Sequence, residues 1–338
     1  MNNSPSGLRV IHNKRVFSLK NFFLRWEWML VGLLAIIIGT SVATSGGNFL
    51  SFPGLMSTLR DFMDKAILVF PMMMIILLGD IDISVGSTIA LCATVMGVML
   101  QSGIDAFICL FSGILLGALC GSINGFLISH FKELSSVIVT VSTMIIYRGI
   151  ATFILRDSAA GSFPSWITKI SYGDIKGIPY TLIFFVAECI FFCVLLSKSK
   201  FGRRLYACGN NSQTSRYSGI NTKGIKFAVF LIIGIFAALS AIILMSKMNS
   251  ARPNIAKNYE LDVIAITVLG GVATSGGKGS PIGVILSTLC ICFLRYGLGL
   301  ININAETVMI IIGLLLIIAV SIPNLKNVIG FSTKKSIK

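Results

Sequence analysis

The stretch 77–87, LLGDIDISVGS, breaks a long apolar part of this chain with two carboxylates and two glycines. A charged side chain inside lipid is costly, so Asp80 and Asp82 should lie at a membrane edge or face a polar path lined by protein. The apolar runs on both sides are long enough to form helices that cross a membrane. The stretch is therefore predicted to connect two membrane-spanning helices.

The composition of the 338 residues is that of an integral membrane protein. Hydrophobic residues make up 55% of the chain and charged residues 12%, and the mean hydropathy is +0.88. This is about half the charge of an average soluble domain. The net charge of +15 does not indicate nucleic acid binding, because the basic residues cluster beside apolar runs, near 9–25, 198–226 and 326–338. Such clusters keep loops in the cytoplasm.

Ten apolar runs have the length of a membrane-spanning helix, with allowance for runs that glycine interrupts. Their approximate cores are 27–45, 62–79, 84–101, 106–129, 135–155, 179–197, 226–246, 260–273, 281–300 and 305–322. They predict an all-α, polytopic bundle of about ten transmembrane spans with both termini in the cytoplasm. Eight spans, without 62–79 and 260–273, would also leave both termini there.

The segment 198–226 sets the orientation of the bundle. It holds seven basic residues and no acidic one, as expected of a cytoplasmic loop, and ten crossings that begin inside place it there. The predicted division is a basic cytoplasmic segment at 1–26, a transmembrane domain at 27–322 and a cytoplasmic tail at 323–338. We expect the first span to stay uncleaved, because its basic leader is long and Trp26 and Trp28 are typical interfacial anchors.

Little in the sequence supports an enzyme or a metal protein. The eight cysteines lie mostly inside apolar runs without a repeated CxxC spacing, which predicts neither disulfides nor a metal site. The two histidines are His12 and His130. The run 276–279 is not a phosphate loop, because glycine rather than Ser or Thr follows Lys278. The chain itself is predicted not to hydrolyse ATP and to carry no cofactor.

The break at 77–87 has a faint echo later in the chain. Leu78-Gly79-Asp80, leading to Gly86-Ser87, resembles Leu269-Gly270-Gly271, leading to the glycines and serine of 276–280. Glycine-interrupted segments at corresponding places in two halves indicate a transport pathway. Glycines that merely allow tight helix packing explain the same pattern equally well.

Further motifs lie at 199–211 (SKFGRRLYACGNN), 260–271 (ELDVIAITVLGG), 121–125 (GSING) and 140–143 (TVST), with Arg148-Gly149 after the last. With the break at 77–87, and over about residues 60–320, they resemble the membrane permeases of ribose-type ATP-binding-cassette sugar importers. Within that family, the stretches 84–93, 101–103 and 117–121 are most similar to permeases of autoinducer-2 importers. The chain departs from the family pattern at Asp80, where a second glycine is usual, and at Ser135, where proline is common.

The resemblance implies a transport subunit that works with partners. These are a second permease, either a copy or a relative, two cytoplasmic ATPase subunits that hold ATP and Mg²⁺, and an extracytoplasmic solute-binding protein. The solute would be a small sugar or sugar-like molecule of the autoinducer-2, ribose or rhamnose type. The expected location is the cytoplasmic membrane of a bacterium, in contact with lipid and not with nucleic acid.

The resemblance also gives the basic loop a role as the docking site for the ATPase. The residues expected to take part are Gly202, Arg203, Arg204, Tyr206, Gly209, Asn210 and Gly219. A short helix here would insert the ring of Tyr206 into a groove of the partner, while its cations meet acidic residues. A plain loop whose charges only set the topology is the alternative. It explains the basic residues but not the glycines or Tyr206.

Polar residues near the break are candidates for a gate and a solute path. Asp80 and Asp82 would form a polar gating element at the inner end of the path, with Ser84 and Ser87 capping the next helix. Neutral groups that can exchange hydrogen bonds with a sugar are present at Asn124, Thr140, Ser142 and Thr143. Ser and Thr in membrane helices often bond their own backbone instead.

Two other functions fit the same residues. A proton-coupled secondary transporter would use Asp80, Asp82 or Glu188 as its proton site, since a carboxylate within the membrane is a functional candidate by default. A membrane anchor or receptor that transports nothing would need no partner ATPase. The two kinds of transporter differ in their energy source, which is ATP in one and a proton gradient in the other.

Overall fold

The chain folds almost entirely into helices. The computed structural model describes residues 26–45, 48–131, 133–161, 163–317 and 321. The helices are α2 (Trp26–Thr44), the 3₁₀ helix η1 (Asn48–Leu50), α3 (Phe52–Ala66), α4 (Val69–Leu77), α5 (Val85–Gln101), α6 (Ala106–His130), α7 (Ser136–Leu155), α8 (Ser165–Tyr172), α9 (Tyr180–Lys198), α10 (Lys200–Asn210), α11 (Ser212–Tyr217), α12 (Thr222–Met248), α13 (Tyr259–Leu269), α14 (Pro281–Leu300) and an apolar helix at Ala305–Ile317.

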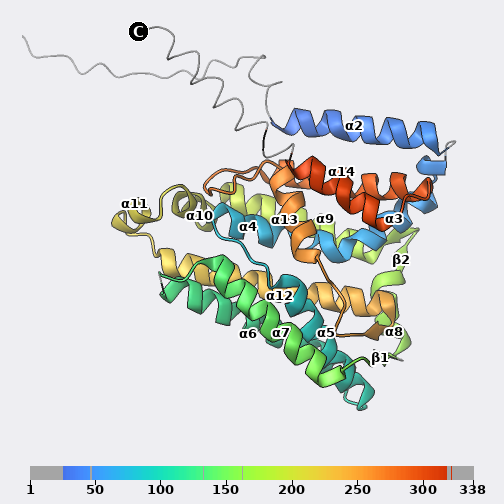
Figure 1. Ribbon diagram of the computed structural model, residues 1–338, viewed down its shortest axis with the longest axis horizontal. Coiled ribbons are helices and arrows are strands. Elements are labelled where there is room, and N and C mark those ends of the chain that lie inside the picture. The colour runs from blue at the N-terminus through green and yellow to red at the C-terminus, as the bar shows by residue number, and fades with distance from the viewer. Residues whose placement is uncertain (1–25, 46–47, 132, 162, 318–320, 322–338) are drawn as a thin grey trace, which may run out of the picture.

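Short strands close the structure at one end. β1 (Ala160–Gly161) pairs antiparallel with β4 (Ser250–Ala251), and β2 (Asp174–Ile175) pairs antiparallel with β3 (Ile178–Pro179). Figure 1 shows these strands and α8 at one end of the molecule, here called the strand end. The helices α10 and α11 lie at the other end, called the α10 end, and α12 runs between the two.

Six described helices are long and apolar enough to cross a membrane, namely α2, α6, α7, α9, α12 and α14. Each coincides with one of the predicted runs. α5 and the helix Ala305–Ile317 are apolar but shorter. The described part of the chain is thus a polytopic helical membrane protein, as the apolar runs predicted. The predicted segment 1–26 and tail 323–338 lie outside the described residues, except for Trp26.

The predicted span 62–79 is not one helix. α3 ends at Ala66 and α4 begins at Val69. The cause is Pro71, which has no N–H for the carbonyl of Ile67 and whose ring crowds that carbonyl. The helix therefore restarts so that the proline falls in the first turn of α4, where proline is tolerated.

α6 and α12 pack closely against each other. A Cβ atom at Gly121 or at Gly234 would overlap the backbone of the facing helix. Small residues allow this close approach in membranes, where van der Waals packing holds helices together. The glycines of the GSING motif thus serve helix packing at least at Gly121.

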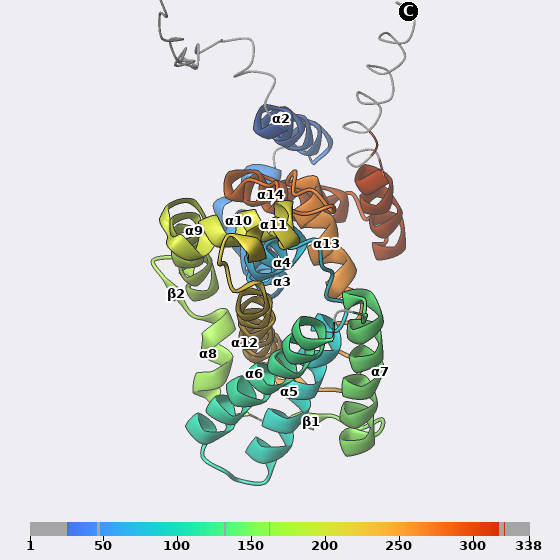
Figure 2. The ribbon, with the colours of Figure 1, turned by 90° about the vertical axis from the view of Figure 1, so that its left-hand side faces the viewer.

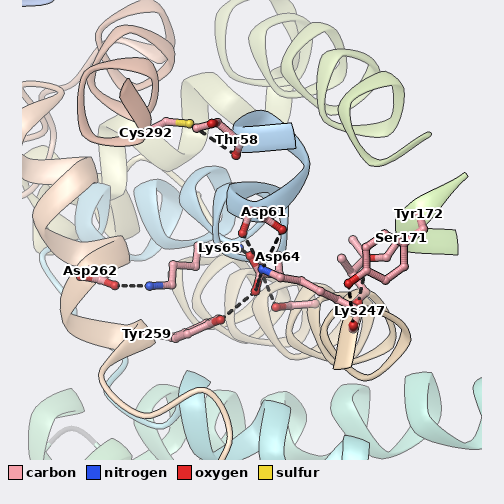
Figure 3. A network of polar contacts seen from close by, with 12 residues as sticks. Thr58, Asp61, Asp64, Lys65, Ser171, Tyr172, Lys247, Tyr259, Asp262 and Cys292 are labelled. Carbon is pink, nitrogen blue, oxygen red and sulfur yellow. Dashed lines mark hydrogen bonds and ion pairs between the residues drawn. The ribbon is translucent and has the colours of Figure 1, made fainter. Parts of the chain in front are cut away.

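An ion-pair network ties α3 to the C-terminal helices (Figure 3). The ammonium group of Lys65 lies 2.6 Å from Oδ2 of Asp262, and Nη2 of Arg295 lies 2.7 Å from Oδ1 of the same carboxylate. Asp262 on α13 thus accepts one charge-assisted hydrogen bond from α3 and one from α14. Such bonds are stronger than those between neutral groups.

The same network reaches α12. Tyr259 donates its hydroxyl hydrogen to Oδ2 of Asp64 at 2.7 Å, and Lys247 donates to the backbone carbonyl of Asp61 at 2.8 Å. Asp64 is almost fully buried, with 1% of its surface exposed. The partners of Asp64 and Lys65 thus lie 195 and 197 residues later in the chain.

Candidate gate and coupling site

The connection between α4 and α5 is buried and held by hydrogen bonds. Oδ1 of Asp82 accepts from the backbone N–H of Ser84 at 2.8 Å and from its hydroxyl at 2.7 Å. The amide of Asn124, on α6, donates to the Ser84 hydroxyl at 2.9 Å. None of the three residues exposes more than 2% of its surface. The predicted gate residues Asp82, Ser84 and Asn124 therefore form one continuous chain of hydrogen bonds.

Burial governs the charge of Asp82. Loss of contact with water raises its pKa from 3.8 to about 6, although the two hydrogen bonds from Ser84 oppose the rise. The carboxylate is thus more easily protonated than an exposed aspartate.

The start of α7 holds the same connection from another side. The N–H of Ile81 donates to the hydroxyl of Ser136 at 3.2 Å, and Thr140 donates to the carbonyl of Ile81 at 3.3 Å. Thr140 also bonds the carbonyl of Ser136 within its own helix, and Thr143 bonds the carbonyl of Thr140. The alternative expectation, that these threonines bond backbone, is what the structure shows. Both are buried inside the chain.

The expected caps of α5 are wrong. Ser84 occupies the N-cap position, but its side chain accepts no hydrogen bond from the helix. The hydroxyl of Ser87 is buried without a hydrogen-bond partner among the described residues. The reason is that Ser84 is already engaged by Asp82 and Asn124, so the carboxylate of Asp82 orders the turn that leads into the helix.

Asp80 lies at the outer edge of this cluster. Its carboxylate forms an ion pair of 2.7 Å with the ammonium group of Lys226, near the start of α12. The side chain of Asp80 is 10% exposed and that of Lys226 is 26% exposed. The connection at 78–84 is thus attached to α6, α7 and α12, and Figure 2 shows these helices together when the α10 end faces the viewer.

The helix α10 touches the connection directly. A Cβ atom at Gly209 would overlap the carbonyl oxygen of Leu77. The same oxygen accepts a hydrogen bond from the N–H of Gly277 at 2.8 Å. The two glycine-rich loops that echo each other in the sequence are therefore in contact, and α10 packs on both. We call this contact among Leu77, Gly209 and Gly277 the backbone junction.

Tyr206 lies inside the molecule rather than at a docking surface. It is partly buried, and its hydroxyl donates to the carbonyl of Gly279 at 3.0 Å. Its ring packs against the chain's own core, so the insertion of this ring into a groove of a partner stays a prediction that the structure does not favour. The exposed aromatic residue is Tyr217, at the end of α11, with 91% of its surface exposed. Tyr217 is not among the residues that the sequence predicts for docking.

The remaining residues of the predicted docking loop take different positions. Arg203, Arg204 and Asn210 are exposed on α10. Gly202 is buried against the carbonyls of Leu195 and Leu196 at the end of α9. Gly219 has a positive φ of 79° and open space around it.

Glu188 belongs to none of these networks. It lies on the buried face of α9, 5% exposed, and neither carboxylate oxygen has a hydrogen-bond partner among the described residues. In the described part of the chain, no group of three or more His, Cys, Asp or Glu side chains could hold a metal ion.

Six apolar helices of membrane-spanning length and a buried polar connection at the α10 end describe a multi-pass membrane protein. The chain belongs to the family described as branched-chain amino acid transport system / permease component, which matches residues 54–320. It is a permease of the cytoplasmic membrane, of the class found in ATP-binding-cassette importers, and not an enzyme.

The relatives carry a more particular description. The chain is 32% identical over 303 residues to the autoinducer 2 import system permease protein LsrD of Enterobacter sp. strain 638, covering 88% of this chain and 92% of that protein. It is 31% identical over 305 residues to LsrD of Klebsiella pneumoniae, covering 88% and 91%. LsrD of Yersinia enterocolitica is 32% identical over 301 residues, covering 87% and 90%. No solved structure matches the chain.

Proposed function

We propose that this chain is one of two permease subunits of an importer for a small sugar-like solute of the autoinducer-2 type. The solute class is supported by the relatives, which are described as autoinducer 2 import permeases and match about nine tenths of the chain. Ribose and rhamnose are the neighbouring choices in the wider family. The second permease is a copy of this chain or a relative, and a solute-binding protein outside the membrane delivers the solute.

The backbone junction is the observation that carries the mechanism. α10 touches the carbonyl of Leu77 through Gly209 and the carbonyl of Gly279 through Tyr206. A displacement of α10 therefore acts on both loops, with no flexible side chain at Gly209 to absorb it. The loop at 77–79 leads directly into the buried connection with Asp80 and Asp82, the proposed gate.

The segment 198–226 is the proposed docking site for two cytoplasmic ATPase subunits, which hold ATP and Mg²⁺. Its exposed cations, Arg203 and Arg204, and its exposed ring, Tyr217, lie on the surface of the α10 end. Aromatic and arginine side chains are the common anchors of protein interfaces. In this arrangement the chain crosses the membrane ten times, with both termini in the cytoplasm. Four of the crossings are the α3–α4 pair, α5, α13 and the helix Ala305–Ile317.

Reversal of the exposed charges tests the docking site. We expect Arg203→Glu combined with Arg204→Glu, or Tyr217→Ala alone, to reduce copurification of the ATPase while membrane insertion and thermal stability stay native. Lys169→Glu, an exposed cation on α8 at the strand end, is the matched control and should copurify normally. Unchanged copurification of both docking variants would contradict the site.

Vesicles test the energy source and the solute. With the complete complex reconstituted, uptake of labelled autoinducer-2 should require ATP and should be inhibited more by unlabelled autoinducer-2 than by ribose. Uptake that persists on a proton gradient without ATP would favour the proton-coupled alternative instead, with the unpaired Glu188 as the first residue to substitute.

A further inference from the structure

A polar cavity of about 660 Å³ opens beside the gate, at the α10 end. The connection at Gly79 and Asp80, the end of α6, the starts of α7 and α12, and α11 form its walls. Its polar lining includes Asp80, Ser135, Ser136, Arg216, Lys223 and Lys226. The gate uses Asp80, with its ion pair to Lys226, and Ser136. Arg216 and Lys223 lie in the docking segment 198–226 but are not among the contacts proposed there.

The charges around the cavity do not balance. Three cations, Arg216, Lys223 and Lys226, face one carboxylate, that of Asp80, which leaves an excess of two positive charges. Asp80 is paired with Lys226. Arg216 and Lys223 form no ion pair with any residue in the described ranges. Both side chains are exposed, so their cationic groups are available to a dianion that enters the cavity from solution.

Two long helices begin at the cavity and add to its positive potential. α7 has 20 residues and α12 has 27, and the residues at their first turns line the wall. The first N–H groups of a helix have no acceptor within the helix, and its dipole places a partial positive charge there. In α12 the side chain of Asn221 already accepts a hydrogen bond from the N–H of Gly224. The side chain of Ser135, at the N-cap of α7, makes no cap hydrogen bond. Serine and threonine hydroxyls supply further donors from other directions.

We propose that this cavity binds a phosphate group, as carried by a small phosphate monoester in the cytoplasm. A monoester has a charge of about −1.5 to −2 at neutral pH and three terminal oxygens, which match an excess of two charges and donors on several sides. The guanidinium of Arg216 and the first turns of α7 and α12 are the donor types that phosphate sites use. A carboxylate has one negative charge and would balance only one of the two excess positive charges.

Binding here is linked to the gate through Lys226. The same ammonium group holds Asp80, at 2.7 Å, and faces the cavity. A phosphate group in the cavity competes with Asp80 for Lys226 and weakens one attachment of the connection at 78–84. The site is thus a point at which a cytoplasmic anion regulates the permease. The binding itself is independent of which solute is transported.

Titration of the purified full-length chain tests the site. Inorganic phosphate and ribose 5-phosphate are added to the chain in detergent, with ribose as the neutral control and with the ionic strength held constant by sodium chloride. Binding is followed by calorimetry and by the thermal unfolding midpoint. We expect saturable binding of both phosphates and none of ribose. Absence of saturable phosphate binding to the native chain would overturn the proposal.

Variants assign the binding to the cavity. Arg216→Gln and Lys223→Gln should each weaken phosphate binding about ten-fold, as loss of one charge-assisted contact does. Lys200→Gln, an exposed cation on α10 that does not line the cavity, should have no effect. Asp80→Asn frees Lys226 and removes the one carboxylate among the lining residues, so it should tighten binding several-fold. Equal weakening by all three Gln variants, or weaker binding by Asp80→Asn, would contradict the site.

The source of the phosphate group is tested in nanodiscs. Saturable binding of ribose 5-phosphate both in phosphatidylcholine discs and in discs that also contain phosphatidic acid would assign the cavity to a soluble monoester. Phosphatidic acid is itself a phosphate monoester. If it abolishes the binding in native discs and does not compete in Lys223→Gln, the cavity is assigned to a lipid headgroup of the same chemistry.

Discussion

Replacement of Asp82 by asparagine separates the charge of this side chain from its hydrogen bonds. One carboxylate oxygen accepts both hydrogen bonds from Ser84, and an amide oxygen accepts them in the same way. The pKa of Asp82 rises from 3.8 to about 6, and one pKa unit corresponds to about 1.4 kcal/mol. At neutral pH the ionised carboxylate therefore destabilises the folded chain by about 3 kcal/mol. We expect Asp82→Asn to be more stable than the native chain by up to this amount.

The pH dependence of stability has a definite sign. The folded chain keeps a proton on Asp82 to a higher pH than the unfolded chain, so the contribution of this group to stability falls as the pH rises from about 4 to about 6 and is constant above that. Asp82→Asn should remove this slope. Thermal unfolding of the purified chain in detergent, at pH values from about 4 to about 8, measures both the gain and the slope.

Asp82→Ala is the control for this experiment. It removes the charge as well, but it leaves the N–H and the hydroxyl of Ser84 without their acceptor, at a cost of about 1–3 kcal/mol for each buried donor. The asparagine variant should therefore be clearly more stable than the alanine variant. Equal stability of the two, or an unchanged pH slope in Asp82→Asn, would refute the reasoning.

Uptake of the solute is a separate measurement on the same variant. We expect Asp82→Asn to express and insert normally but to transport poorly. Native uptake would show that Asp82 serves only to order the start of α5.

Three further variants test the backbone junction and the ion-pair network. Gly209→Ala places a methyl group against the carbonyl of Leu77. The ratio of solute imported to ATP hydrolysed in vesicles should therefore fall, while membrane insertion is retained. A native ratio would show that the backbone junction does not couple ATP hydrolysis to transport. Tyr206→Phe removes only the hydroxyl donated to Gly279 and should lower stability by about 1 kcal/mol, with a smaller loss of coupling than Gly209→Ala. Asp262→Asn leaves Lys65 and Arg295 without their carboxylate and should lower thermal stability by about 2 kcal/mol, whereas no loss would mean that solvent screens both pairs.

The helices were predictable because lipid imposes their length and their internal hydrogen bonding. α6, α7 and α9 each begin and end within one residue of the apolar runs at 106–129, 135–155 and 179–197. The break between α3 and α4 was predictable as well, since Pro71 lies inside the run at 62–79. Apolar length alone predicts one span there, because it takes no account of the missing N–H of the proline.

The partners of the buried charges were not predictable from sequence. Asp64 and Tyr259 are 195 residues apart, and Lys65 and Asp262 are 197 apart. Composition shows that these charges exist, but no local pattern indicates which of them meet. Their pairing depends on how α3, α13 and α14 pack, which is tertiary information.

The face of α10 on which Tyr206 lies was predictable from the sequence. Gly202 and Gly209 lie four residues before and three residues after it, so all three share one face of a helix, while Arg203 and Arg204 lie elsewhere on the surface. A face with two glycines is one that packs against backbone. The same helical spacing therefore predicts Tyr206 on the inner side of α10. No comparable signal marks Tyr217, whose helix has only six residues.

The glycines of the two echoing loops had two equal explanations, a transport pathway or tight packing. The structure joins the two explanations, because Gly277 bonds the carbonyl of Leu77 and Gly209 packs on that same oxygen. Contacts between backbone atoms have no side-chain rotamers that can absorb a displacement, so tight packing is itself a means of transmission. The carboxylates of Asp80 and Asp82 follow within five residues of this oxygen, and each is held by a different helix, α12 for Asp80 and, through Ser84, α6 for Asp82. A movement of α10 thus reaches the polar connection through backbone contacts alone, in addition to the end of α9, on which Gly202 packs.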